Sequence, residues 1–198
     1  MDTSKPILFC DFDGTICHDR YWRSLPAEKY TQVQELLFQG DMQKANDWMR
    51  GTYTAEEVNQ FVAESIGMPY AELWDLFVQD CRTMRVKKEI LEKLSALRQR
   101  YTVILITGNM DSFSRFSAPV LSLENYFDHI SNSYYEGVSK TDNDGDLFAV
   151  YATKYGVQLS DCVLLDDNAA VCTIFERLGG KPYLVSSTHN VEYYIDQL

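Results

Sequence analysis

The most informative segment of the sequence is Ile7-Leu8-Phe9-Cys10-Asp11-Phe12-Asp13-Gly14-Thr15. An apolar run of four residues stops there at an acidic turn. Short apolar runs with branched and aromatic side chains suit a strand that is buried on both faces, as in a parallel sheet. Polar residues that follow such a strand lie at the sheet edge where open α/β proteins bind ligands. The segment therefore predicts an α/β fold with a polar site at the end of its first strand.

Further apolar runs recur along the chain, and helical patterns separate them. The clearest runs are 103–106 and 162–165, and weaker ones lie at 129–131 and 183–185. Apolar residues recur with helical spacing over 88–100, 113–123, 147–155 and 169–178. Strands that alternate with helices form parallel βαβ units, whose helices cover both faces of the sheet. The sequence thus predicts a three-layer, Rossmann-like core.

Residues 18–86 interrupt this alternation. They contain no good strand pattern, and four helical stretches fit instead, at 26–39, 41–50, 55–66 and 70–83. Thr54 and Glu57 have the spacing of a capping box at the start of the third stretch. We therefore expect a catalytic core made of residues 1–17 and 87–198, with an all-helical unit, residues 18–86, inserted into it.

Composition narrows the classes of function. The chain has 198 residues, a formal charge of −11, 45% hydrophobic residues and 24% charged residues, which is ordinary for a globular protein. The acidity argues against nucleic-acid binding, and no apolar run approaches the roughly 20 residues of a membrane span. The N-terminus has no signal-peptide pattern, and the five cysteines have no metal-ligand spacing. We expect a cytoplasmic protein with reduced thiols.

Polar residues follow three of the predicted strands. They are Asp11 and Asp13, then Thr107-Gly108-Asn109, then Asp166-Asp167-Asn168. Because the carboxyl ends of parallel strands share one edge, these residues should meet. Four converging carboxylates would repel one another, and a divalent cation would remove that conflict. Since the ligands are oxygens, without His or Cys, they favour magnesium over zinc.

Such a site suits phosphoryl transfer. Asp11, at the strand end, can attack phosphorus and form an aspartyl-phosphate. Asp13 points the same way if the chain stays extended, so it can protonate the leaving oxygen and later activate water.

Other residues could bind the phosphoryl oxygens. Thr107 offers a hydroxyl, and Gly108 and Asn109 offer backbone amides. A lysine would complete the charge neutralisation, and Lys140 is the candidate because it follows the weak strand and precedes the helix at 147–155.

At these residues the sequence resembles the haloacid dehalogenase-like (HAD) superfamily, in its phosphatase type. The similarity spans residues 7–185, and the unit 18–86 looks like the helical cap of that family. The resemblance implies that Asp11 is nucleophile and magnesium ligand, and that Asp13 is general acid/base and gives its backbone carbonyl to the metal. It further implies that Thr107 and Lys140 bind the phosphoryl group.

By the same resemblance Asp167 is an inner-sphere magnesium ligand and Asp166 a supporting carboxylate. Dehalogenating members lack an acid/base at the position of Asp13, so its presence points to phosphoryl transfer. The sequence departs from the family where Thr141, often a proline, follows Lys140. The acidic loop 141–146 is also longer than usual. We expect that loop to be solvated.

The expected function is that of a Mg²⁺-dependent phosphatase for a small phosphorylated metabolite, in a monomer or homodimer. The alternatives are a phosphomutase of the same superfamily and a non-catalytic protein that binds a phospho-ligand. Substrate contacts are expected where the chain leaves the catalytic edge, at His18, Asp19, Tyr21 and Arg23.

Overall fold

A five-stranded parallel sheet forms the centre of the protein, with strand order β3-β2-β1-β4-β5. The computed structural model describes residues 4–40 and 42–198. The strands are β1 (Ile7–Cys10), β2 (Thr102–Thr107), β3 (His129–Asn132), β4 (Val163–Asp166) and β5 (Lys181–Leu184). The first strand pairs with both β2 and β4, so the acidic turn after β1 lies in the middle of the sheet edge.

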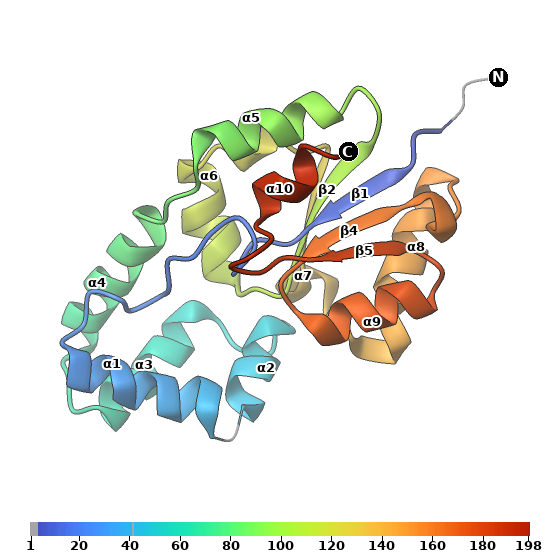
Figure 1. Ribbon diagram of the computed structural model, residues 1–198. Coiled ribbons are helices and arrows are strands. Elements are labelled where there is room, and N and C mark those ends of the chain that lie inside the picture. The colour runs from blue at the N-terminus through green and yellow to red at the C-terminus, as the bar shows by residue number, and fades with distance from the viewer. Residues whose placement is uncertain (1–3, 41) are drawn as a thin grey trace.

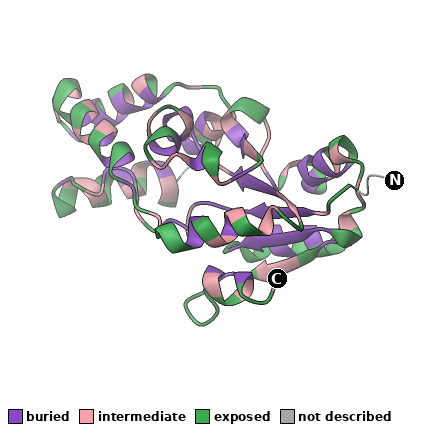
Figure 2. Cartoon of the chain, turned by 90° about the horizontal axis from the view of Figure 1, so that it is seen from above, coloured by how far each residue is buried: buried purple, intermediate pink, exposed green. Residues whose placement is uncertain are grey.

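Helices cover both faces of the sheet, and the predicted three-layer core is confirmed (Figure 1). These helices are α5 (Lys88–Leu97), α6 (Ala118–Val120), α7 (Ser133–Glu136), α8 (Asp146–Tyr155), α9 (Ala169–Arg177) and α10 (Val191–Ile195). Leu8 shares one buried cluster with residues of α5 and α10. Phe9 points to the other face, where its ring meets Phe148 of α8 and Phe175 of α9. Figure 2 shows buried central strands between helices whose outer surfaces are exposed, and β1, β2 and β4 are the strands buried almost throughout.

The segment predicted as one helix over 113–123 is broken into three turns. A π turn spans Phe113–Ser117, α6 follows, and a 3₁₀ turn spans Leu123–Asn125. Pro119 has no amide hydrogen to continue the helical ladder, and Ser122 has a positive φ of 51°. The helical period was correct, but the proline and the left-handed residue prevent a regular helix.

Residues 18–86, here called the cap segment, contain four helices and, in their described part, no strand. The helices are α1 (Ala27–Gln34, continued by a π turn at Glu35–Gln39), α2 (Gln43–Met49), α3 (Ala55–Ser65) and α4 (Tyr70–Arg82). Thr54 and Glu57 form the predicted capping box. Trp22, Trp48 and Phe77 are fully buried and pack their rings together at the centre of this segment. None of the described helices combines the length and apolar character needed to cross a bilayer.

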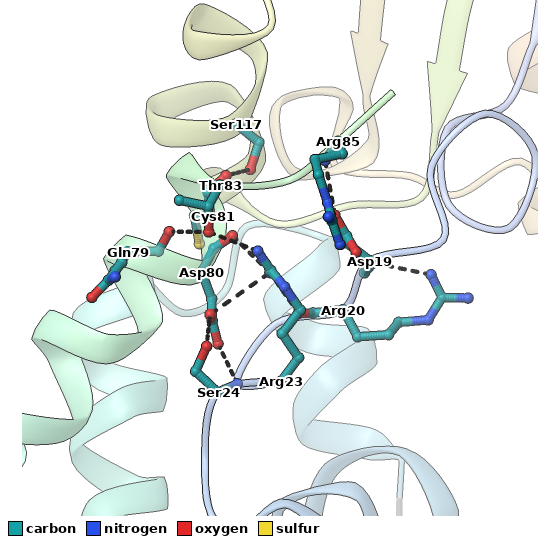
Figure 3. Close-up of polar contacts among 10 residues, drawn as sticks. All are labelled: Asp19, Arg20, Arg23, Ser24, Gln79, Asp80, Cys81, Thr83, Arg85 and Ser117. Atoms are coloured by element: carbon teal, nitrogen blue, oxygen red, sulfur yellow. Dashed lines mark hydrogen bonds and ion pairs between the residues drawn. The ribbon is translucent and has the colours of Figure 1, made fainter. Parts of the chain in front are cut away.

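Polar contacts hold the two connections between core and cap segment together (Figure 3). Asp80, 1% exposed, accepts hydrogen bonds from the amide and hydroxyl of Ser24. Arg23 donates to the carbonyl of Asp80, and Asp19 accepts from the amide of Arg85. The outgoing and returning chains are therefore tied to each other.

A buried carboxylate of the core joins the cap segment nearer to the site. Asp111 accepts a hydrogen bond from the indole nitrogen of Trp48 at 2.8 Å and another from the amide of Ala55. Arg115 reaches Asp111 and also Glu56 on α3. Because Asp111 is 3% exposed, these bonds lie in an interior where unpaired polar groups are costly.

Candidate active site

A buried lysine lies between two aspartates at the carboxyl edge of the sheet. Asp11 follows β1, Asp166 ends the neighbouring strand β4, and Lys140 comes from the loop before α8. Its Nζ atom donates to Oδ1 of Asp11 at 2.7 Å and to Oδ2 of Asp166 at 2.5 Å. Among the described residues no group donates to Oδ2 of Asp11, which leaves that oxygen free to face a substrate.

Burial and the neighbouring charges shift the pKa values of the ionisable groups in this cluster. Burial raises the pKa of Asp11 to about 7, although Lys140 opposes the shift. Burial disfavours the charge on Lys140, but the two carboxylates outweigh it and raise the pKa of this lysine. Burial also raises the pKa of Asp13 to about 6, against the opposing charge of Arg20. The lysine therefore stays positively charged near neutral pH.

Three carboxylates at this edge fit a divalent cation. One oxygen from each of Asp11, Asp166 and Asp167 lies within 4.8 Å of the others. When all three are ionised, they face one ammonium and leave an excess of two negative charges. Oxygen ligands with that excess charge suit Mg²⁺. The carboxylate of Asp13 is not part of the group, and the role of its backbone carbonyl stays a prediction.

The turn after β1 brings its backbone against the carboxylate of Asp167. Gly14 has a φ of +81°, and its amide donates to the carbonyl of Cys17. A Cβ atom at Gly14 would overlap the carboxylate of Asp167. Glycine is therefore required here for two independent reasons, the left-handed backbone and the close approach.

We expect Gly14→Ala to lower both the stability of the protein and its affinity for Mg²⁺. The left-handed conformation costs an alanine about 1–2 kcal/mol, and the methyl group must displace Asp167 from its two partner carboxylates. Urea unfolding and a Mg²⁺ titration measure the two effects.

Gly67→Ala is the matched control, because Gly67 also has a positive φ, of +61°, but open space around its Cβ position. It should lose stability and keep its affinity for Mg²⁺. Equal Mg²⁺ affinities in the two variants would contradict a role of Gly14 in placing Asp167.

Asn109 contacts Asp13 through its side chain. Its Nδ2 atom donates to Oδ2 of Asp13 at 2.6 Å, and its Oδ1 atom accepts from the hydroxyl of Tyr21 at 2.7 Å. Its backbone amide, expected to face a phosphoryl oxygen, donates instead to Oγ of Ser133. Thr107 is buried beside it, with Oγ1 at 3.4 Å from Nδ2 of Asn109. Tyr21 and Asn109 thus orient Asp13.

The cavity at the carboxylates has a volume of about 320 Å³. Asp11, Asp13, Gly108, Lys140, Asp166 and Asp167 line it from the core, and Asn46, Met49 and Arg50 line it from the cap segment. Residues at the strand ends and residues of the cap segment therefore line the same cavity.

The four expected substrate contacts do not line this cavity. His18 and Asp19 line a second cavity of about 610 Å³, which shares Asp167 with the first. Tyr21 is buried against Asn109, and Arg23 is held by Asp80 and Thr83. Their role in binding a substrate therefore stays a prediction, which the lining of this cavity does not support.

The structure adds residues that sequence patterns did not indicate. Arg20 lies 3.8 Å from Asp13, and Arg50 of the cap segment binds Asp142 with two hydrogen bonds. The expectation of a solvated acidic loop is therefore wrong for Asp142, because a cation 92 residues away in the chain pairs with it. Asp144 is exposed, with Arg177 at its side. No local pattern could signal these contacts.

The fold and the site together define an α/β protein with an aspartate directly after its central strand, at the sheet edge. The chain belongs to the haloacid dehalogenase-like hydrolase family, whose family model matches residues 6–179. No curated protein matches the sequence.

Solved structures of this family share the fold. A HAD family enzyme from Bacteroides thetaiotaomicron, crystallised with magnesium and inorganic phosphate, has a TM-score of 0.72 at 17% identity, covering 96% of this chain and 98% of that one. A predicted HAD-like hydrolase from Porphyromonas gingivalis has a TM-score of 0.66 at 18% identity, covering 98% and 97%. L-2-haloacid dehalogenase from Xanthobacter autotrophicus has a TM-score of 0.65 at 15% identity, covering 93% and 80%. At these identities the likeness establishes the fold, and the chemistry must be argued from the site.

Proposed function

We propose that this protein is a Mg²⁺-dependent phosphatase that hydrolyses small phosphomonoesters through an aspartyl-phosphate on Asp11. The observation that carries the proposal is the second carboxylate, Asp13, which lines the same cavity as Asp11 and is held by Asn109. A carboxyl group in that place can supply and remove protons, which cleavage of a phosphate ester needs and displacement of a halide does not.

In the first step, Oδ2 of Asp11 attacks phosphorus and the bond from phosphorus to the ester oxygen breaks. Asp13 gives its proton to that oxygen, so the product leaves as an alcohol. Lys140 offsets negative charge at Asp11 and on the transferred group.

In the second step, Asp13 takes a proton from water, and the water oxygen attacks phosphorus. The bond between phosphorus and Asp11 then breaks, which releases inorganic phosphate and restores the carboxylate of Asp11 and the protonated carboxyl group of Asp13. Asp11, Asp166 and Asp167 would hold Mg²⁺, which when bound neutralises charge on the phosphoryl oxygens. The cap-segment residues Asn46, Met49 and Arg50 face the leaving group and limit its size.

Removal of the metal tests this proposal. We expect turnover of p-nitrophenyl phosphate to fall at least about 100-fold in excess chelator, because charge neutralisation by a bound metal is worth several kcal/mol. Added Mg²⁺ should restore the rate. Undiminished turnover in chelator would contradict the proposal. Chloride release from 2-chloropropionate, without phosphatase activity, would assign dehalogenation instead.

A further inference from the structure

Arg50 lines the cavity from the cap segment, directly after α2, and each of its three side-chain nitrogens donates one hydrogen bond to a protein acceptor. Its Nε atom donates to Oδ2 of Asp142 at 2.9 Å and its Nη2 atom to Oδ1 of Asp142 at 2.7 Å. Its Nη1 atom lies 3.3 Å from the carbonyl of Asn46, to which it donates. A two-pronged bond of this kind occupies the edge of the guanidinium that would otherwise grip a carboxylate or phosphate.

Asp142 also stabilises the turn that carries Lys140. Its Oδ2 atom accepts a hydrogen bond from the amide of Ser139 at 2.8 Å, besides the bond from Arg50. The neighbouring guanidinium and these hydrogen bonds, with Arg50 the largest cause, lower the pKa of Asp142 to about 2. Near neutral pH both side chains are therefore ionised, and the net charge of the Arg50–Asp142 pair is zero.

Cations are scarce in the rest of the cavity. Within residues 4–40 and 42–198, Arg50 and Lys140 are the lysine and arginine side chains that line it. Lys140 is held between Asp11 and Asp166, and Arg50 is held by Asp142. Its remaining polar lining includes the uncharged side chains of Asn46, Ser133, Ser139 and Thr141. An anionic group on the leaving alcohol would lie near carboxylates, and both cations that line the cavity are already paired. Its transfer from water into the cavity would therefore cost desolvation energy without a compensating ion pair.

We infer that the enzyme selects monophosphates whose leaving alcohol is compact and uncharged, and that Asp142 sets this selectivity by occupying Arg50. The inference rests on the proposed function and names its substrate class. The cavity volume of about 320 Å³ must hold the phosphoryl group and the alcohol together. A substrate with a second phosphate would lack a counter-charge there, so the site favours hydrolysis over the exchange of phosphates that a mutase needs.

Two ligands of nearly equal shape test this selectivity. Glycerol 2-phosphate and 2-phosphoglycerate differ by one hydroxymethyl group that is replaced by a carboxylate. We expect the wild-type protein to favour glycerol 2-phosphate at least about 10-fold in kcat/KM. This factor corresponds to the smallest usual free-energy cost of burying a charged group without a partner. Asp142→Asn should raise the relative kcat/KM for 2-phosphoglycerate at least about 10-fold, because it leaves the charge of Arg50 uncompensated.

The change at Asp142 can also lower the rate for every substrate, because Asp142 stabilises the turn that carries Lys140. The ratio of the two kcat/KM values within one variant is independent of such a general loss. Arg50→Gln should keep the preference for the uncharged alcohol, since it removes the cation and leaves the carboxylate of Asp142. Arg20→Gln is the matched control, because Arg20 lies near Asp13 but lines the other cavity. Its ratio should equal that of the wild type.

Binding measurements separate this inference from the proposed chemistry. The same two ligands are titrated calorimetrically, with Mg²⁺, into the Asp11→Asn protein with and without Asp142→Asn, where hydrolysis does not interfere. An unchanged affinity ratio on Asp142→Asn would overturn the inference, and so would a wild-type preference for 2-phosphoglycerate that Arg50→Gln abolishes. Absence of turnover with every phosphate ester would overturn the proposed function. The ratio of the two affinities would still test the role of Asp142.

Discussion

Asp11→Asn is expected to reduce kcat for phosphate esters by about four orders of magnitude or more, as loss of a covalent nucleophile does in other enzymes. The amide keeps the size of the side chain and an oxygen that can accept from Lys140, so the fold should survive. The lone pair of the amide nitrogen, however, is delocalised into the carbonyl group, so this nitrogen does not attack phosphorus. Steady-state kinetics and near-ultraviolet circular dichroism measure the loss of rate and the retention of structure.

Isotopic labelling shows which bond water attacks. In a single turnover in ¹⁸O-labelled water, the wild-type protein should place the label in inorganic phosphate and none in Asp11, because water attacks phosphorus. Hydrolysis of a carbon ester on Asp11, as dehalogenation would require, places the label in the aspartate carboxylate. Mass spectrometry of the peptide that contains Asp11 distinguishes the two. Label in that peptide would contradict the phosphatase proposal, whatever the rate.

Lys140→Met has the second largest expected effect, and it acts on stability as well as on rate. Removing the ammonium leaves Asp11 and Asp166 buried without their cation, and breaking such a pair costs about 3–5 kcal/mol. Loss of one charge donor to the transferred group should lower kcat at least about 100-fold. Because Mg²⁺ can neutralise the same carboxylates, the stability defect should shrink when Mg²⁺ is added. Urea unfolding at zero and saturating Mg²⁺ measures this.

Lys154→Met is the control for the buried lysine. Lys154 lies on an exposed face of α8, so its replacement should change stability by less than about 0.5 kcal/mol and leave kcat unchanged. If Lys140→Met keeps its rate within a few-fold of the wild type, then another residue offsets the charge of the transferred group, and Lys140 serves stability alone.

Much of the fold could be predicted because its determinants are local. The run Ile7–Cys10 is apolar throughout since both faces of β1 are covered, and this is the pattern that indicates a central parallel strand. The capping box at Thr54 is likewise a local signal. The position of Lys140 could be inferred from element order, because a loop that follows β3 and precedes α8 returns to the same sheet edge.

The contacts between core and cap segment could not be predicted. Arg50 and Asp142 are 92 residues apart, and Tyr21 and Asn109 are 88 apart. Each pair forms only when the helices of the cap segment pack at one particular angle against the sheet edge. That angle depends on the summed packing of many side chains, and no single spacing in the sequence encodes it. For this reason the expected substrate contacts do not line the cavity at the carboxylates, and its lining residues from the cap segment, Asn46, Met49 and Arg50, were not predicted.

The position of the tryptophans has a practical consequence. All three, Trp22, Trp48 and Trp74, lie in the cap segment, so the tryptophan fluorescence of the protein comes from that part of the molecule. The buried indole of Trp48 is bonded to Asp111 of the core, across the boundary between the two parts. A separation of the two parts would break that bond and expose the indole to water, which shifts its emission to longer wavelength. The fluorescence of Trp48 would therefore report such a separation in stopped flow without any added dye.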